Sequence, residues 1–172
     1  LATVLRFSEA HHTDSGIVSA WVANSQHRKG WSARTLKAEL LDRRPDAQVA
    51  VLGLAYKENT HSIKNSPSLA CVRELEGKNL AVFDPVVKGD VAPFARACSS
   101  AMECIAGADA MAILTPWPEF RSLDLAAVAS AMRGRLIVDP YRVLASEAAL
   151  AAGFDYVTLG VPPLRAKDRR HA

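Results

Sequence analysis

Short apolar runs alternate with stretches of helical spacing from residue 48 onward. The runs are rich in Val, Leu and Ile and are apolar at odd and even positions alike, which is typical of strands buried on both faces. They predict strands at 49–54, 80–83, 110–114, 136–138 and 156–159, with helices near 67–76, 91–106, 121–133 and 143–152 between them. This alternation predicts a parallel sheet with right-handed crossovers, and therefore a doubly wound α/β domain.

The first forty-odd residues predict a helical arm instead. Apolar positions recur there at helical spacing, first at Ile17, Val18, Trp21 and Val22 and again at Leu36, Leu40 and Leu41. Gly30 either interrupts this helix or weakens it by about 1 kcal/mol, and Pro45 ends the pattern. We predict three parts: a helical connector at 1–45, an α/β domain at 46–164, and a basic, disordered tail at 165–172.

Composition excludes several classes of protein. Of 172 residues, 49% are hydrophobic and 23% are charged, the balance of an ordinary globular domain. The net charge of +3 is too small, and too concentrated in the tail, to indicate nucleic-acid binding. No apolar run approaches the roughly 20 residues of a membrane helix, and the first thirty residues contain no apolar signal-peptide core. We expect a cytoplasmic protein and, because the chain begins with Leu1 rather than Met, a piece of a longer one.

Several chemically capable residues are predicted to be structural. Cys71, Cys98 and Cys104 lack CxxC spacing and the histidines lack partners at ligand spacing, so neither a disulfide framework nor a metal site is expected. We interpret Cys71 and Cys104 as core thiols. Asp84 and Asp139 each precede a proline at a strand end, where an aspartate typically caps the turn.

The loop after the first predicted strand, residues 53–68, is the richest in polar groups. It carries Lys57 and Lys64 before Ser66 and Pro67, which together form a typical helix start. A helix N-terminus beside two lysines favours an anion such as phosphate. The same residues also suit a solvated loop, and the pattern alone does not choose between these interpretations.

A typical dinucleotide-binding site is not expected on this domain. Of a GxGxxG fingerprint after the first strand, the chain has only Gly53, and no GxxxxGK[ST] phosphate loop occurs anywhere. The domain is therefore predicted not to bind NAD in the usual dinucleotide-binding manner.

Ordered motifs nevertheless resemble a known family, the UDP-glucose/GDP-mannose dehydrogenases, over residues 49–145. The start of that family's C-terminal domain reads approximately GLAFK, then Thr, one or two Asp, Arg and Glu-Ser-Pro. The matching residues here are Val51 to Lys57, Thr60, Ser66-Pro67, Phe83-Asp84-Pro85, Ala108-Asp109-Ala110, Thr115, Trp117, Glu119-Phe120 and Val138-Asp139. The chain is thus similar to the C-terminal, UDP-binding domain with the end of the central dimerisation region before it.

The resemblance implies an activity and a fold. Enzymes of this family oxidise the C6 alcohol of a nucleotide sugar to a uronic acid and reduce two NAD. An N-terminal domain binds NAD, and a Rossmann-like C-terminal domain binds the nucleotide, with UDP favoured over GDP here. We therefore expect NAD to be bound mainly by a domain absent from this chain, and a UDP-sugar to be the partner of this domain. The full-length protein is expected to be a homodimer that acts in polysaccharide biosynthesis.

Site residues carry over from the family position by position. Lys57 matches the lysine at the substrate, and Lys64 stands where the family has an arginine that reaches the cofactor. The substrate-contacting arginine aligns with Tyr141, and Arg142 replaces it if the alignment shifts by one residue. The family's GGxCxxxD nucleophile motif is missing, so no catalytic residue is assigned and the chain alone is expected to be inactive.

Other functions remain open at this point. The main alternative is a non-catalytic Rossmann-like module that binds a nucleotide or a partner. A third hypothesis, a nucleic-acid binder, depends entirely on the basic tail.

Overall fold

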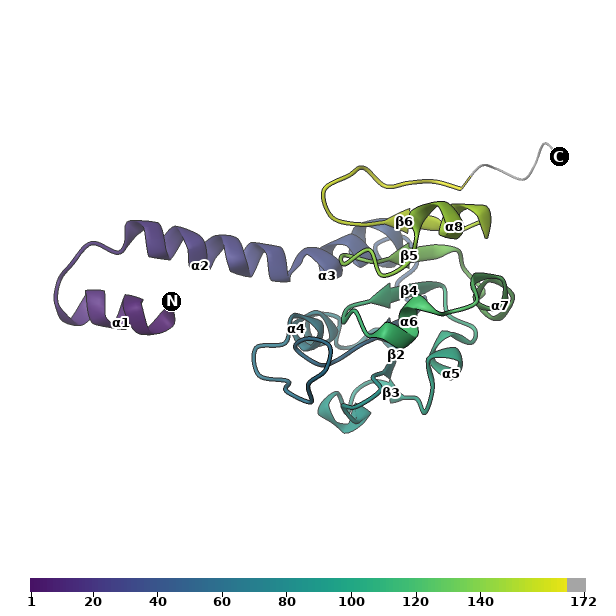
Figure 1. The fold of residues 1–172 in the computed structure, drawn as a ribbon, viewed down its shortest axis with the longest axis horizontal. Helices are drawn as coiled ribbons and strands as arrows, with labels where there is room; N and C mark the ends of the chain where they lie inside the picture. Colours follow the sequence, from purple (N-terminus) through teal and green to yellow (C-terminus); the bar gives the residue numbers. More distant parts are fainter. Residues whose placement is uncertain (167–172) are drawn as a thin grey trace.

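A six-stranded, wholly parallel sheet forms the centre of the molecule in the computed structural model, which describes residues 1–166 (Figure 1). The strand order is β3-β2-β1-β4-β5-β6. The strands are β1 (Gln48–Leu52), β2 (Asn79–Phe83), β3 (Arg96–Ala97), β4 (Ala110–Ile113), β5 (Leu136–Val138) and β6 (Asp155–Val157). This arrangement confirms the predicted doubly wound α/β fold. The predicted tail lies largely outside the described residues.

Helices cover both faces of the sheet. They are α4 (Pro67–Glu74), α5 (Ala101–Ile105), α6 (Pro118–Arg121), α7 (Leu125–Ala131) and α8 (Ser146–Ala151). Helix α4 packs with the arm on one face, whereas α5 packs against α7 on the other (Figure 1). The predicted start of α4 is confirmed, because the Ser66 hydroxyl accepts from Leu69 N and Pro67 occupies the first turn.

The predicted helix at 91–106 is wrong over its first half. A 3-10 turn, η2 (Gly89–Val91), and edge strand β3 precede a short α5. Residues 96–98 pair with β2 instead of forming a helix, and Cys98 N donates to Val82 O at 2.9 Å, which extends this pairing. Helix α5 then begins at Ser100, whose hydroxyl accepts from Glu103 N.

The predicted helix at 121–133 is two helices instead. Asp124 starts α7 by accepting from Ala126 N and Ala127 N, so the chain leaves α6 and caps a new helix three residues later.

The arm extends away from the sheet as helices α1 (Ala2–Ala10), α2 (Gly16–Lys29) and α3 (Trp31–Leu36), followed by a π-helical turn, η1 (Lys37–Leu41) (Figure 1). Gly30 N donates to Gln26 O and Gly30 O accepts from Arg34 N, so hydrogen bonding continues past the break between α2 and α3. Leu36 and Leu41 are buried as the apolar pattern predicts, but Ile17 and Trp21 are 68% and 58% exposed. Within the described residues Ile17 and Trp21 therefore present uncovered apolar surface, whereas Val18 and Val22 of the same helix are half-buried.

Asp109 joins the arm to the start of the sheet. Its buried carboxylate pairs with Arg133 and, at 2.8 Å, with Arg44, and it accepts from Gln48 N at 2.9 Å. The Arg133 hydrogen bond holds the pKa of Asp109 well below its usual value, against the opposing effect of burial.

We expect Asp109→Asn to lower the free energy of unfolding by about 2–3 kcal/mol at pH 7, because two cations lose their partner. Since the folded pKa is lowered, this contribution is complete above the unfolded pKa of about 3.9 and is lost as the pH falls through the folded value. Urea denaturation between pH 7 and pH 2 measures it. Exposed Asp42→Asn is the control, and equal stability of the two variants at pH 7 would contradict the role of Asp109.

Candidate functional site

The sheet reverses its winding between β1 and β4, and the loops leaving these two strands meet there. In open α/β sheets this position, beyond the carboxyl ends of the strands, is where ligands bind. Gly53 follows β1 with φ 97°, and a Cβ on it would lie 2.5 Å from Thr115 Cβ. The two loops are then tied by the Thr115 hydroxyl, which donates to Ala55 O at 2.8 Å. The Ser68 hydroxyl, in the first turn of α4, donates to Leu114 O at 2.8 Å and fastens that helix to the end of β4.

Asp84 fixes the ends of three strands at this edge. Its carboxylate accepts hydrogen bonds of 2.7–3.0 Å from the backbone N–H of Leu54, Ala55, Val86 and Val87 and from Trp117 Nε1. Burial alone would raise the pKa of Asp84, but the four backbone donors outweigh it and lower the pKa below its usual value. The predicted structural role of Asp84 is confirmed, and Trp117 is a buried residue that packs at this edge.

Asp139 does the same for the loop after β5. It accepts from Tyr141 N at 3.2 Å, from Leu144 N at 2.9 Å and from the Tyr156 hydroxyl at 2.8 Å. Arg142, the residue after Tyr141, takes the left-handed backbone conformation with φ 53°. Asp139 is therefore also structural, and it sets the direction of the loop that carries Tyr141 and Arg142.

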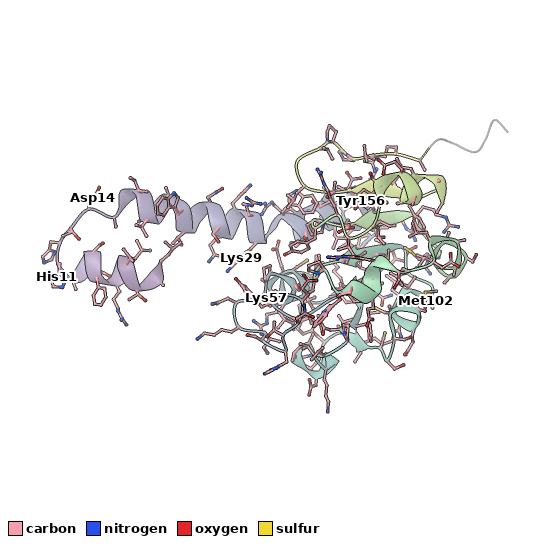
Figure 2. All side chains as sticks on the ribbon, in the orientation of Figure 1. His11, Asp14, Lys29, Lys57, Met102 and Tyr156 are labelled. Atoms are coloured by element: carbon pink, nitrogen blue, oxygen red, sulfur yellow. The ribbon has the colours of Figure 1, made fainter. Side chains whose placement is uncertain are left out.

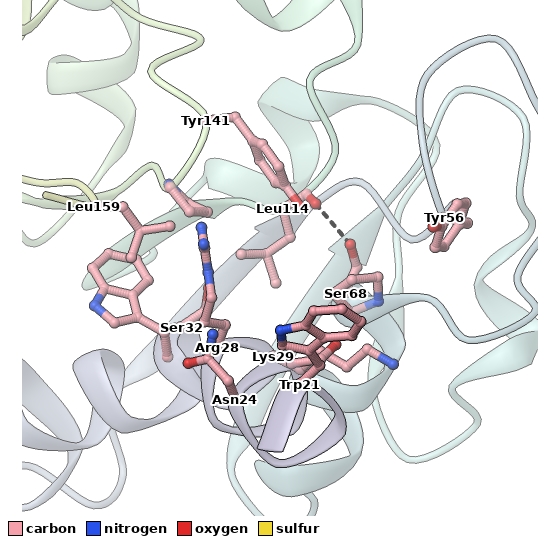
Figure 3. A pocket seen from close by; sticks show the side chains of 14 residues that line it. Trp21, Asn24, Arg28, Lys29, Ser32, Tyr56, Ser68, Leu114, Tyr141 and Leu159 are labelled. Atoms are coloured by element: carbon pink, nitrogen blue, oxygen red, sulfur yellow. Dashed lines mark hydrogen bonds between the residues drawn. The ribbon is translucent and has the colours of Figure 1, made fainter. Parts of the chain in front are cut away.

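A cavity of about 510 Å³ lies between this edge of the sheet and the arm (Figure 3). One wall is formed by residues of α2 and α3, and the other by the start of α4 and the loops after β1, β4, β5 and β6. Its lining consists of Trp21, Asn24, Ser25, Arg28, Lys29, Trp31, Ser32, Tyr56, Pro67, Ser68, Leu114, Pro140, Tyr141 and Leu159. Cations, hydroxyls and aromatic rings thus face one space, a combination that suits a phosphorylated aromatic ligand.

The predicted site residues are distributed unevenly around this cavity. Tyr141 lines it, whereas Lys57 lies on the exposed loop beside the lining residue Tyr56 (Figure 2). Arg142 lines a smaller cavity of about 190 Å³ and donates to the backbone oxygen of Leu159 at 3.2 Å. Lys64 is exposed farther along the Lys57 loop and lines neither cavity.

The arm's share of the cavity was missed by the sequence analysis. Trp21, Asn24 and Arg28 lie on the wall formed by α2 (Figure 3), but the sequence assigned this segment only to a connector. The sequence did contain a signal for this wall, because an aromatic ring, an amide and two cations recur close together at helical spacing along α2.

The loop after β1 does not fit a dinucleotide pyrophosphate. Fourteen residues, 53–66, separate β1 from α4, so the strand and helix are not joined by a tight glycine turn. Thr115 closes on Gly53, Ser66 already caps α4, and Pro67 contributes no N–H. The nicotinamide cofactor of the resembled family therefore has no Rossmann-type site in the described residues.

The remaining candidates for chemistry are also structural. Burial raises the pKa of Cys71 to about 12 and also raises that of Cys104, so both are weak nucleophiles in the core. Within residues 1–166 no three His, Cys, Asp or Glu side chains lie together so as to hold a metal ion. In the same range no helix has the length and apolar character to cross a membrane.

Comparisons with known proteins match this architecture. Residues 50–146 match the model of the UDP-glucose/GDP-mannose dehydrogenase family, UDP binding domain. The chain is 30% identical over 164 residues to a UDP-glucose 6-dehydrogenase of Rhizobium meliloti and 31% identical over 170 residues to one of Pseudomonas aeruginosa. Each of these matches covers 92% of this chain but 38% of the relative, so the chain spans well under half of their length.

A solved structure shares the fold at somewhat lower identity. The UDP-D-ManNAc dehydrogenase from Pyrococcus horikoshii superposes with a TM-score of 0.72 and 28% identity, over 86% of this chain and 34% of that one. The family match includes the loop after β1 as well as Asp84 and Asp139. The chain therefore belongs to the UDP-glucose/GDP-mannose dehydrogenase family, and its matched residues are the UDP-binding domain of that family.

Proposed function

We propose that this chain binds the nucleotide of a UDP-sugar on behalf of an NAD-dependent nucleotide-sugar 6-dehydrogenase. The observation that carries the proposal is the position of the 510 Å³ cavity, at the switch point of a sheet that matches a UDP-binding domain. Tyr56 and Tyr141 line it from within the matched residues. The relatives above are dehydrogenases, which favours this function over a non-catalytic binding module.

Within this proposal the residues divide by ligand. Tyr141 contacts the nucleotide directly, because it already lines the cavity. Lys57 approaches from the loop after β1, and Arg142 from the turn that Asp139 fixes, to bind the phosphate or sugar groups. Lys64 reaches toward NAD held by another part of the enzyme, as a charge without the two-pronged geometry of arginine.

The chemical step belongs to the whole protein. Bound in turn, two NAD would each accept one of the two hydrides released as the C6 alcohol becomes a uronic acid, with water supplying the second carboxylate oxygen. This chain's residues hold and orient the nucleotide, and none of them is assigned to the oxidation. We further propose that residues 1–45 end a connecting region and that the whole protein is a cytoplasmic homodimer. The exposed side chain of Ile17, which lies outside the cavity lining, supports contact with a second copy.

Calorimetric titration of the chain with UDP, GDP and NAD tests the binding function. We expect UDP to bind, GDP to bind more weakly and NAD not to bind, since the loop after β1 does not fit a dinucleotide. Preference for GDP would change the nucleotide assigned. Binding of NAD without UDP would contradict the proposal.

Lys57→Ala is expected to weaken UDP binding at least tenfold, because one charge-assisted contact to the ligand is lost. The exposed side chain has no hydrogen-bond or ion-pair partner among residues 1–166, so the fold should be unaffected. Exposed Lys88→Ala removes the same charge and is the control. Unchanged UDP affinity in Lys57→Ala would remove Lys57 from the site.

A further inference from the structure

The charges around the cavity are all positive and all come from the arm. Arg28 and Lys29, in the last turn of α2, are the only charged residues in its described lining, which contains no Asp or Glu. Two neighbouring cations that face a partly enclosed space repel each other unless an anion lies between or beside them. The charge of the cavity therefore favours an anionic ligand.

Neither cation is engaged elsewhere among residues 1–166. The side chains of Arg28 and Lys29 form no hydrogen bond or ion pair in that range, unlike the next two cations of the arm. Arg34 donates to His27 O at 2.6 Å, and Lys37 pairs with Glu74 at 2.9 Å. Arg28 and Lys29 are thus available to a ligand, whereas their neighbours hold the arm together and fasten it to α4.

Aromatic rings lie on both walls of the same space. Trp21 is 58% exposed on α2, and Tyr56 and Tyr141 are 49% and 47% exposed on the opposite wall. Figure 3 shows Trp21 with Arg28 and Lys29 on the side of the arm, facing the side that carries Tyr56 and Tyr141. Exposed rings of this kind stack on nucleobases with little dependence on sequence.

We infer that Arg28 and Lys29 hold the diphosphate of the nucleotide, so that the arm is one half of the binding site rather than a connector. This inference rests on the proposed function and adds to it which residues bind the diphosphate. The rings on the two walls hold the base, and the two cations neutralise the phosphates next to them. The chain then recognises a nucleoside diphosphate in preference to the nucleoside.

The test is calorimetric titration of the 172-residue chain with UDP and with uridine. In the double variant Arg28→Gln/Lys29→Gln we expect UDP affinity to fall at least tenfold, with uridine affinity changed less than twofold. Affinity of the unaltered chain for UDP should also fall with added salt, and this dependence should weaken in the variant. The charge-preserving exchange Arg28→Lys/Lys29→Arg should retain most of the UDP affinity.

A matched control removes the same charge far from the cavity. Arg43→Gln/Lys78→Gln alters one cation after η1 and one before β2, at the opposite edge of the sheet, and should bind UDP within twofold of the unaltered chain. Equal UDP affinity of Arg28→Gln/Lys29→Gln and the control would overturn the inference. The two cations would then only stabilise the C-terminal end of α2. Parallel loss of uridine would overturn it too, since the arm would then only shape the cavity. Failure of the unaltered chain to bind UDP would instead refute the proposed function itself.

Discussion

Asp84→Asn is expected to lower the free energy of unfolding by about 3–5 kcal/mol. The carboxylate is buried and accepts five hydrogen bonds of 2.7–3.0 Å from donors on three loops. An amide keeps the shape but turns an N–H₂ group toward N–H donors, so some of them lose their acceptor in the interior. Urea denaturation followed by tryptophan fluorescence measures the loss.

The pH dependence gives a second test of the same residue. Because the folded pKa of Asp84 is lowered, its stabilising contribution is complete above the unfolded pKa of about 3.9 and disappears as the pH falls through the folded value. Asp84→Asn should therefore be less stable at pH 7 and lose less on acidification. Exposed Asp90→Asn, six residues after Asp84, should follow the unaltered chain at every pH. Matching curves for the two variants would show that Asp84 is not the acceptor described.

Asp84 also illustrates what the sequence could predict. Strands buried on both faces leave continuous apolar runs, so Val49 to Leu52 and the other long strands were predictable, and with them the parallel order and the edge where polar loops gather. An aspartate before a proline at a strand end typically caps the turn, and the structural role of Asp84 was predictable for that reason. The pattern failed at β3, because Arg96 and Ala97 are both exposed and form no apolar run.

The composition of the cavity could not be predicted in the same way. Arg28 and Tyr141 lie more than a hundred residues apart, and only the packing of the arm against the sheet places them around one space. Helical spacing shows which side of α2 is apolar but not what that side faces. Lys57, in contrast, was chosen by motif, and its side chain lies on the exposed loop beside the cavity rather than in its lining.

Gly53→Ala is expected to destabilise the fold by about 3–5 kcal/mol and to reduce UDP binding in whatever fraction remains folded. The left-handed conformation, φ 97°, costs a residue with a Cβ about 1–2 kcal/mol. The added carbon would also lie 2.5 Å from Thr115 Cβ and 2.6 Å from Thr115 N, so one of the two loops at the switch point must shift.

Gly77→Ala separates these two causes. Gly77 has nearly the same backbone conformation, φ 84°, but a Cβ there meets nothing within 4 Å, so only the conformational cost of about 1–2 kcal/mol applies. If Gly53→Ala loses no more stability than Gly77→Ala in urea denaturation, the contact with Thr115 is not limiting. A larger loss, together with weaker UDP binding by calorimetry in Gly53→Ala but not in Gly77→Ala, would mean that the close approach of β1 and β4 sets the geometry of the cavity. Glycine at position 53 then serves this domain by letting two strand ends meet.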